Sequence, residues 1–551
     1  MLDTDTKTRA ILNPVGYPPK VATKDAAPRR SGLHGRKVFL IDSRFDDSAE
    51  LLKQVAAWFA DHMPATETEL VPLAKYYGDD DPDLWARIRA EDGVAIVGVG
   101  HCSTCAPAVT THAITLETRH GVPAVALHTE KFDRVAKSVA KMGGLPQLPL
   151  VFVPQPVMGK TADELRAYVD GTDPITGQGV MAEIIRGLTE APEIDMSKIR
   201  FDRSTPREVD FDGTEEELQT AFLERRWTDM LPIVIPTDAR VEAMLRGTSR
   251  RPDEVVGRME PTLNRGKWEY TVEKVAVNAV MAGARPEYFP VILALAASGV
   301  SARGSTSSSG AAMAVVNGPI RHEIGMNCGI GAMGPYNHAN ATIGRAYGLL
   351  SQNLQGGSVP GETYMGSLGS GHTYANLTFA ENEERSPWEP LHVQNGCAAD
   401  ASAVSIFFGN RTTTFSLGLR ADRWREHVKD MLLGTDAITA PVLVLDPIAA
   451  KQFVTRGGFD TKEKLIDWLH GTATMPAARF WDLQLVQNYV YPHATYGTEP
   501  LATKLGAAPD DEIPIFLKER ISVIVTGGET NGYWQIFGAR PMGTFPVDDW
   551  R

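Results

Sequence analysis

The chain has 551 residues, of which 43% are hydrophobic and 22% are charged, and its formal net charge at pH 7 is −13. This composition is typical of a globular protein of about two to four domains, and the negative charge argues against nonspecific binding of nucleic acid. No apolar run approaches the ~18 residues of a membrane-spanning helix, and the N-terminus lacks a hydrophobic signal core. We therefore expect a cytoplasmic protein with neither a membrane nor a nucleic-acid partner.

The first third of the chain predicts an arm followed by one α/β domain. Residues 1–36 are polar and rich in proline, and they predict an arm that lies on the surface or on a neighbouring subunit. Short apolar runs predict strands at residues 37–41, 66–72, 94–98, 122–127 and 150–153, and helical spacing predicts helices at 48–62, 82–90, 106–117 and 134–141. Five strands with helices between them predict a flavodoxin-like, doubly wound domain over residues 37–170.

Two cysteines stand at the end of the central predicted strand. Residues 94–98 read as a strand buried on both faces, and Cys102 and Cys105 follow it just before the next helix. Ser103 and Thr104 are good N-cap residues, so the thiols fall at the first helical turn, where free N–H groups and the helix dipole favour a thiolate. Active sites of open α/β sheets form at such strand ends. The pattern predicts a reactive dithiol.

Two other interpretations of the cysteine pair remain open. A pair spaced in this way can be an inert structural pair or part of a metal site, in which His112, on the same helix face, would be a third ligand. A structural zinc site usually needs a second such pair, whereas Cys328 and Cys397 lie far apart in the sequence. Four cysteines are also too few for a secreted protein held together by disulfides.

Other polar side chains are expected at the same edge of the sheet. His101 adjoins Cys102, Asp42 follows the first predicted strand, and His128 and Glu130 follow the fourth. Carboxyl ends of parallel strands meet at one edge. We expect His101, His128 and Glu130 to act with the two cysteines in catalysis, and Asp42 to contact the substrate.

The rest of the chain predicts a linker and a larger second domain. Residues 171–213 have few apolar runs and predict a linker that packs on the first domain, with a short helix at 181–188. Residues 214–551 predict an α/β or α+β domain that binds ligand or carries out catalysis. Its expected elements are helices at 214–227, 237–245, 271–282, 288–297, 424–433 and 459–469, and strands at 231–236, 441–445 and 521–525.

About a hundred residues from position 304 onward are dense in Gly, Asn, Ser and His, and they predict long, ordered loops that form a binding surface. We expect these loops to close over Cys102 and to share one pocket with it. Glycine turns and asparagines suit an anion, and two arginines could each hold a carboxylate or instead pair with a nearby acid. The expected substrate-binding residues are Arg285, Asn327, Cys328, His338, Asn340, Arg345, Glu381, Glu383 and Trp388. The alternative for the glutamates is a solvated run of charge.

The cysteine turn resembles that of the UGSC-type family, which is named after a selenocysteine-Gly-Ser-Cys motif. Here the motif is Cys102-Ser103-Thr104-Cys105, so the two middle residues differ and Cys102 stands where some relatives carry selenocysteine. The likeness extends to residues 111–117, 121–123 and 128–130, and in the second domain to residues 273–288, 317–319, 339–345 and 380–390. Tolerance of selenium implies redox turnover, because a selenol is ionised at neutral pH and its mixed bond to sulfur is reduced quickly.

Three functions follow from these observations. The first is a thiol-dependent enzyme in which Cys102 attacks a small, anionic organic substrate and Cys105 resolves the adduct. The second is a nonredox lyase, hydratase or isomerase, and the third is a metal-binding protein or metalloenzyme that uses Cys102, Cys105 and a histidine. Only redox cycling requires Cys105. No nucleotide or pyridoxal signature is present in the sequence, so no such cofactor is expected. The expected partners are an external thiol or disulfide reductant, for example of the thioredoxin type, and further copies of the chain in a homo-oligomer.

Overall fold

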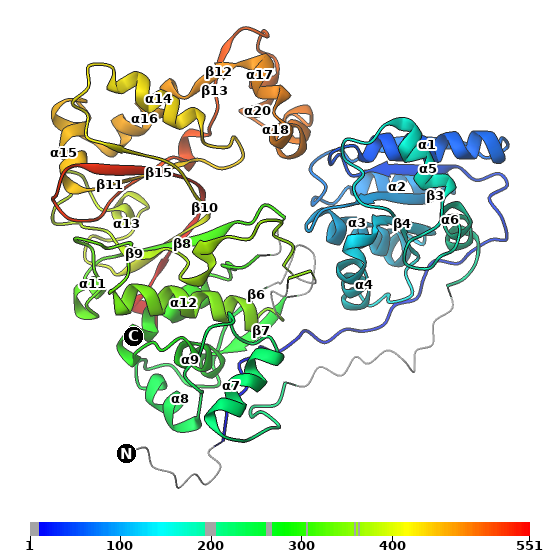
Figure 1. Ribbon diagram of the computed structural model, residues 1–551. Helices are drawn as coiled ribbons and strands as arrows, with labels where there is room; N and C mark the ends of the chain where they lie inside the picture. Colours follow the sequence, from blue (N-terminus) through cyan, green and yellow to red (C-terminus); the bar gives the residue numbers. More distant parts are fainter. Residues whose placement is uncertain (1–9, 193–204, 260–266, 305–306, 357–359, 362–363) are drawn as a thin grey trace.

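The computed structural model describes residues 10–192, 205–259, 267–304, 307–356, 360–361 and 364–551. Parts of the predicted arm (1–9), of the linker (193–204) and of the loops (305–306 and others) lie outside the described residues. Two domains are visible, with the first on the right of Figure 1 and the second on the left. Among the described helices, none has the length and apolar character needed to cross a bilayer.

The first domain is built on a five-stranded sheet. Its strands are β1 (Val38–Asp42), β2 (Thr68–Pro72), β3 (Val94–Gly100), β4 (Ala124–Thr129) and β5 (Leu150–Val153), in the order β2-β1-β3-β4-β5, and every pairing is parallel. Helices α2 (Pro82–Ala90), α3 (Cys105–Thr115) and α4 (Asp133–Met142) pack on one face, whereas α1 (Ser48–His62), α5 (Ala162–Asp170) and α6 (Val180–Thr189) pack on the other. The predicted parallel α/β arrangement is therefore confirmed.

The first domain continues beyond the boundary predicted at residue 170. Helix α6 buries Val180, Met181, Ile184 and Leu188 against the sheet, so this part of the predicted linker belongs to the first hydrophobic core. Helix α5 begins with a capping box in which Thr161 and Glu164 satisfy each other's backbone N–H groups.

The second domain surrounds a six-stranded mixed sheet in the order β14-β11-β15-β10-β8-β9. The strands are β8 (Ala311–Asn317), β9 (Thr378–Ala380), β10 (Ala403–Leu417), β11 (Pro441–Leu445), β14 (Ser522–Val525) and β15 (Tyr533–Pro546). Helices α9 (Val272–Met281), α10 (Phe289–Ala297) and α12 (His338–Asn353) cover one part of it, and α14 (Trp424–Leu433), α15 (Pro447–Thr455) and α16 (Lys462–Thr472) cover another.

Shorter elements complete this domain. They are helices α7 (Glu215–Glu224), α8 (Asp238–Leu245), α11 (Ile320–Glu323), α13 (Leu391–Gln394), α17 (Ala477–Asp482), α18 (Gln484–Tyr489), α19 (Tyr491–Thr495) and α20 (Leu501–Leu505), and the antiparallel strand pairs β6 (Val255–Met259) with β7 (Trp268–Thr271) and β12 (Thr474–Pro476) with β13 (Glu512–Pro514).

The region predicted as long loops contains regular elements between its loops. It contains the fully buried strand β8 and helix α12, whose sequence is rich in Gly and Asn. Gly344 explains the presence of glycine within this helix. A Cβ at this position would lie 1.8 Å from the carbonyl oxygen of Ala375, so the glycine allows close packing and does not form a turn. Conversely, residues 231–236 form no strand, because the segment is flanked by prolines and its Pro236 carbonyl accepts from Leu12 of the arm.

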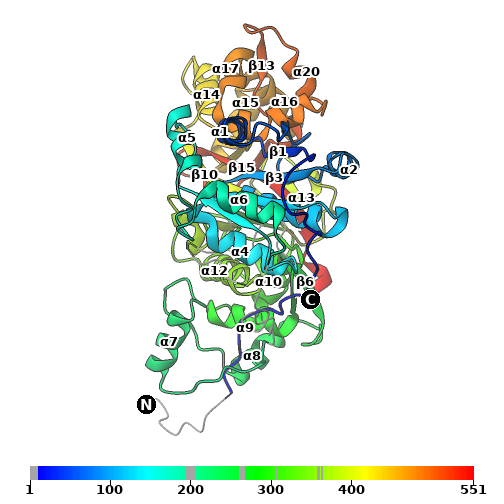
Figure 2. The ribbon, with the colours of Figure 1, turned by 90° about the vertical axis from the view of Figure 1, so that its right-hand side faces the viewer.

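The arm joins the two domains (Figure 2). Ile11 and Leu12 lie in the core of the second domain, and Lys274 Nζ donates to the Asn13 carbonyl at 2.6 Å. Further along, Arg29 forms a salt bridge with Glu117 of the first domain at 2.5 Å, and both side chains are buried. The same segment therefore contacts both domains.

Candidate active site

The two cysteines bond reciprocally to each other's backbone. The Cys102 N–H donates to Cys105 Sγ at 2.8 Å, and the Cys105 N–H donates to Cys102 Sγ at 2.9 Å. Both are free thiols, and their exposed fractions are only 3% and 0%. Cys105 is the first residue of α3, so each sulfur lies at the helix terminus where backbone N–H groups have no helical partner.

The environment separates the acidities of the two thiols. Burial raises the pKa of the Cys102 thiol, but hydrogen bonds from the side chains and backbones of Cys105 and Thr104 outweigh burial, so its pKa lies below the usual value. The pKa of Cys105 lies well above the usual value, because of burial and of the neighbouring Cys102. The surroundings therefore favour the thiolate at Cys102 over the thiolate at Cys105.

A hydroxyl chain leads from Tyr77 to Cys102. Tyr77 Oη lies 2.5 Å from Thr104 Oγ1, which in turn lies 3.5 Å from Cys102 Sγ. Burial raises the pKa of Tyr77 well above its usual value, with the cysteines adding to the effect, so its phenol stays protonated. Thr104 occupies the N-cap position but makes no capping hydrogen bond with its side chain, which instead connects the phenol and the sulfur.

The predicted histidines take different places. The ring of His101 is buried beside Phe45, whose carbonyl oxygen lies 3.0 Å from Nε2. His128 is fully buried, its Nε2 lies 3.2 Å from Thr110 Oγ1, and burial lowers its pKa to about 3. A Cβ on Gly100 would lie 2.0 Å from His128 Nδ1, so only glycine allows strand β3 to pass this ring. His128 is thus a neutral ring packed between β3 and α3.

The ligand set considered for a metal is not assembled around the thiols. His112 Nε2 lies 2.7 Å from the carbonyl oxygen of Tyr77, and its ring packs against Trp85. Within the described ranges, no group of three or more His, Cys, Asp and Glu side chains is placed to hold a metal ion.

The carboxylates at the strand ends have local partners. Asp42 is buried at the end of β1, where it accepts hydrogen bonds from the Ser48 hydroxyl and from the Arg44 N–H at 2.8 Å, and burial raises its pKa. Glu130 is partly exposed and lies 3.3 Å from Lys131. Asp42 therefore orders the turn after β1.

The second domain supplies an aromatic ring to the thiol site. Tyr489, the last residue of α18, has its ring centroid 5.7 Å from Phe45, 6.1 Å from Tyr76 and 6.4 Å from Tyr77. It packs against the same hydrophobic cluster that contains both cysteines. Burial raises the pKa of Tyr489, and Cys102 raises it further. The aromatic rings that cover the thiols therefore come from both domains.

Polar bonds hold this segment in place. Asn488 Nδ2 and Gln484 Nε2 both donate to Asp46 Oδ1, at 2.7 Å and 2.8 Å, and Arg44 donates to Thr495 Oγ1 at 2.9 Å. Residues 484–496 were not among the predicted site residues, although their density of tyrosines is a signal in the sequence.

The loop residues predicted to bind substrate are instead bonded within the second domain. Asn340 Nδ2 donates to the carbonyls of Asn327 and Ala332, each at 3.0 Å. His338 Nδ1 lies 3.3 Å from the Tyr288 hydroxyl. Arg345 makes two hydrogen bonds of 2.9 Å to Asp229, and the exposed Arg285 lies 4.0 Å from Glu287. Each arginine thus has the acid partner considered as its alternative.

The predicted glutamates form an internal ion-pair cluster rather than a solvated run of charge. Glu381 is fully buried and pairs with Lys462 at 3.1 Å, and Glu383 pairs with Arg321 at 3.0 Å. Half-buried Cys328 has a pKa raised by burial.

Trp388 is buried, and its Nε1 donates to the Phe459 carbonyl at 2.9 Å. Over the described ranges, the hydrogen bonds and ring contacts between residues 36–190 and the second domain come from residues 484–496 and not from these loops.

Comparison with known proteins is informative for the first part of the chain. Residues 10–176 match the family model described as the UGSC family, which spans the arm and most of the first domain. The CxxC turn and its surrounding rings lie inside the match, except for those from residues 484–496. Searches of curated proteins and of solved structures gave no significant match.

Proposed function

Residues 10–176 match the model of the UGSC family, and on that premise we propose that this protein is a thiol-dependent enzyme that reduces a small, anionic organic substrate. Cys102 is the nucleophile and Cys105 the resolving thiol. The observation that carries the proposal is the asymmetry of the pair, with the pKa of Cys102 lowered and that of Cys105 raised. A resolving thiol must stay protonated while its neighbour attacks, and this asymmetry meets that need.

The chemistry balances as a two-electron reduction. The Cys102 thiolate attacks an electrophilic atom of a substrate R–X, so that an S–R bond forms and X leaves with the electron pair of the R–X bond. Cys105 then loses its proton and attacks Cys102 Sγ, which forms the disulfide and releases R with an electron pair and a proton. An external dithiol, of the thioredoxin class, reduces the disulfide and closes the cycle.

The surrounding groups support this role for Cys102. The Thr104 hydroxyl can donate to the thiolate while it accepts from Tyr77, so the negative charge on sulfur is stabilised without an ion pair. The rings of Tyr77 and Tyr489 limit the access of water. We assign Tyr77 to positioning Thr104 rather than to contact with the substrate.

The anionic character of the substrate is supported by one cation. Arg540 of β15 is exposed and has no salt-bridge partner among the described residues. Burial raises the pKa of Tyr76, and a hydrogen bond with Tyr77 and, less strongly, the positive charge of Arg540 lower it. We also propose that the first domain is flavodoxin-like, because its parallel strand order is that of this doubly wound class.

The test uses disulfides of different charge as model substrates. In a background with Cys328→Ser and Cys397→Ser, the protein is mixed with 5,5′-dithiobis(2-nitrobenzoate), a dianion, with neutral 2-hydroxyethyl disulfide and with cationic cystamine. We expect the fastest reaction with the dianion, two thiols released per chain, and a Cys102–Cys105 disulfide by mass spectrometry.

Two variants separate the possible outcomes of this experiment. Cys105→Ser should stop at a mixed disulfide on Cys102 with one thiol released, and Cys102→Ser should not react. If Cys105→Ser reached the same end point as the parent protein, Cys105 would not be a resolving thiol and a nonredox role of Cys102 would be favoured.

A further inference from the structure

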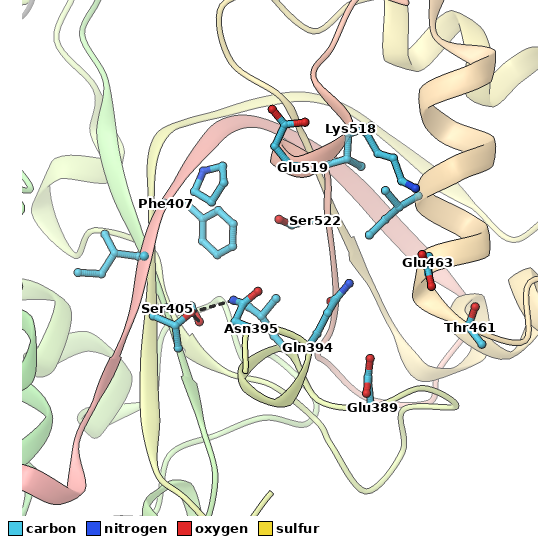
Figure 3. Close-up of a pocket in the computed structure, with 17 residues that line it drawn as sticks. Glu389, Gln394, Asn395, Ser405, Phe407, Thr461, Glu463, Lys518, Glu519 and Ser522 are labelled. Carbon is cyan, nitrogen blue, oxygen red and sulfur yellow. Dashed lines mark hydrogen bonds between the residues drawn. The ribbon is translucent and has the colours of Figure 1, made fainter. Parts of the chain in front are cut away.

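A second candidate site lies in the second domain, away from the thiols. A cavity of about 840 Å³ opens beside the sheet, a size within the range of small-molecule sites. Its floor is formed by residues of β10, β14 and β15, and its walls by α13, α16 and residues 518–519 (Figure 3). None of its lining residues contacts Cys102 or Cys105 through a hydrogen bond or ring contact in the described part of the chain.

The polar lining of the cavity is mainly acidic. Glu389, Glu463 and Glu519 line it with exposed carboxylates, and none has a hydrogen-bond or salt-bridge partner in the described ranges. The lining cation, Lys518, is already paired with Asp467. The cavity therefore carries excess negative charge, opposite to what the proposed substrate of Cys102 would need.

One mostly covered serine in the cavity has a hydroxyl that no described residue pairs with. Ser522 is 8% exposed, lines the cavity and lies near its centre in Figure 3, and its hydroxyl makes no hydrogen bond within the described ranges. The neighbouring hydroxyls are satisfied: Ser405 Oγ and Thr544 Oγ1 lie 2.8 Å apart, and Asn395 donates to Thr544 at 2.8 Å. Most of the Ser522 side chain is covered while its hydroxyl stays open to the cavity, so it can bond to a ligand atom there.

The remaining surface is apolar. Phe407 of β10 and Pro541 of β15 lie opposite each other in the sheet, and Leu391, Ile466 and Ile521 line the cavity as well. A ligand that satisfies this lining has a hydrocarbon body and positively charged donors at its ends.

We propose that this cavity binds a small organic cation, a diamine or polyamine with a short hydrocarbon chain. Its ammonium groups contact the carboxylates of Glu389, Glu463 and Glu519, and its methylene chain lies over Phe407 and Pro541. Ser522 Oγ accepts a further N–H. Ammonium groups supply both N–H donors and positive charge, which complement the three negatively charged carboxylates. A polyol of the same length would supply donors without the charge.

The proposal is tested by calorimetry on the full chain with three probes of equal length: hexane-1,6-diamine, hexane-1,6-diol and adipate. We expect the diamine to bind at least about tenfold more tightly than the diol, with adipate the weakest and the diamine affinity falling as salt is added. The double variant Glu463→Gln/Glu519→Gln should lose at least about tenfold in diamine affinity.

Two control variants accompany the measurement. Glu426→Gln removes an exposed carboxylate of α14 that does not line the cavity, and it should bind the diamine as the parent does. Cys102→Ser should also bind unchanged, which separates this site from the thiol chemistry. Equal affinity for diamine and diol, undiminished diamine binding by the double variant with an unchanged unliganded Tm, or no diamine binding would each overturn the proposal.

Discussion

Asp46 and Asn488 form a reciprocal pair that connects the two domains. Asn488 Nδ2 donates to Asp46 Oδ1 at 2.7 Å, and the Asp46 N–H donates back to Asn488 Oδ1 at 3.0 Å. Asp46 has a left-handed backbone conformation with φ of +45°, which is uncommon for residues other than glycine. The turn that faces α18 therefore has an unusual backbone conformation. This pair fixes residue 488 next to Tyr489, the ring that covers the thiol cluster.

Replacement of Asn488 by alanine should therefore make Cys102 more accessible. Loss of both hydrogen bonds weakens the hold on Tyr489, and we expect the rate of Cys102 alkylation by iodoacetamide to rise several-fold. The matched control is Asp61→Ala, which removes an exposed salt bridge to Arg166 in the same domain. Equal alkylation rates in the parent and in Asn488→Ala would show that residues 484–496 do not limit access.

Thr104 should set the acidity of Cys102. Alkylation rate follows the thiolate, so the pH midpoint of the parent should lie below the ~8.5 of a free cysteine. Thr104→Val removes a hydroxyl that stabilises the thiolate, and we expect the midpoint to rise, whereas Thr104→Ser keeps the hydroxyl and should stay close to the parent. A midpoint in Thr104→Val equal to that of the parent would contradict this role.

Arg540 should govern the charge preference of the thiol reaction. Arg540→Ala removes the guanidinium whose field reaches Tyr76, so the rate advantage of a dianionic disulfide over a neutral one should shrink several-fold. Arg285→Ala is the control, because Arg285 is exposed beside Glu287. A preference that survives in Arg540→Ala would assign the selectivity to another group.

The buried His128 should make the first domain sensitive to acid. Its pKa in the folded protein is about 3, below the ordinary histidine value of about 6.5, so between these values the unfolded chain binds a proton that the folded chain does not. The free energy of unfolding should therefore fall by about 1.4 kcal/mol per pH unit from this residue as the pH drops below 6.5. Denaturation of His128→Gln at pH 7 and pH 5 should show a shallower fall than the parent; parallel curves would refute the assignment.

The pair of Lys462 and Glu381 should be costly to break. Both side chains are at most 1% exposed, so Lys462→Met leaves an uncompensated buried carboxylate and should lower the free energy of unfolding by about 3–5 kcal/mol. Lys464→Met, on the same helix but in an exposed pair with Asp460, should have little effect. The double variant Glu381→Gln/Lys462→Met should recover part of the loss, as measured by urea denaturation.

The first domain was largely predictable because its signals are local. Buried strands with apolar runs and amphipathic helices follow from periodicity, and the CxxC turn follows from its place between β3 and α3. The second domain was harder to predict. Strand β8 consists largely of alanine and valine, and α12 contains Gly344 for close packing, so composition indicated loops where tertiary contacts impose a strand and a helix.

The candidate site shows the same division. Cys102, Cys105 and His101 could be placed from the sequence, since they adjoin one strand end. Tyr489 and Asn488 could not, because their approach to residues of the first domain depends on a contact more than four hundred positions apart in the chain. The pairing of Arg345 with Asp229, a buried acid that accepts from Nε and Nη2, could not be identified from the sequence because it is a tertiary contact.

The arm has a consequence for synthesis on the ribosome. Residues 10–17 pair with segments near residues 208, 237 and 269, yet the whole first domain is translated between them. The first domain can complete its sheet before the segments that pair with residues 10–17 have been synthesised. The second domain is therefore discontinuous in sequence. When it assembles, residues 10–17 pair with segments that follow the first domain, so the first domain lies within the chain loop that this pairing closes.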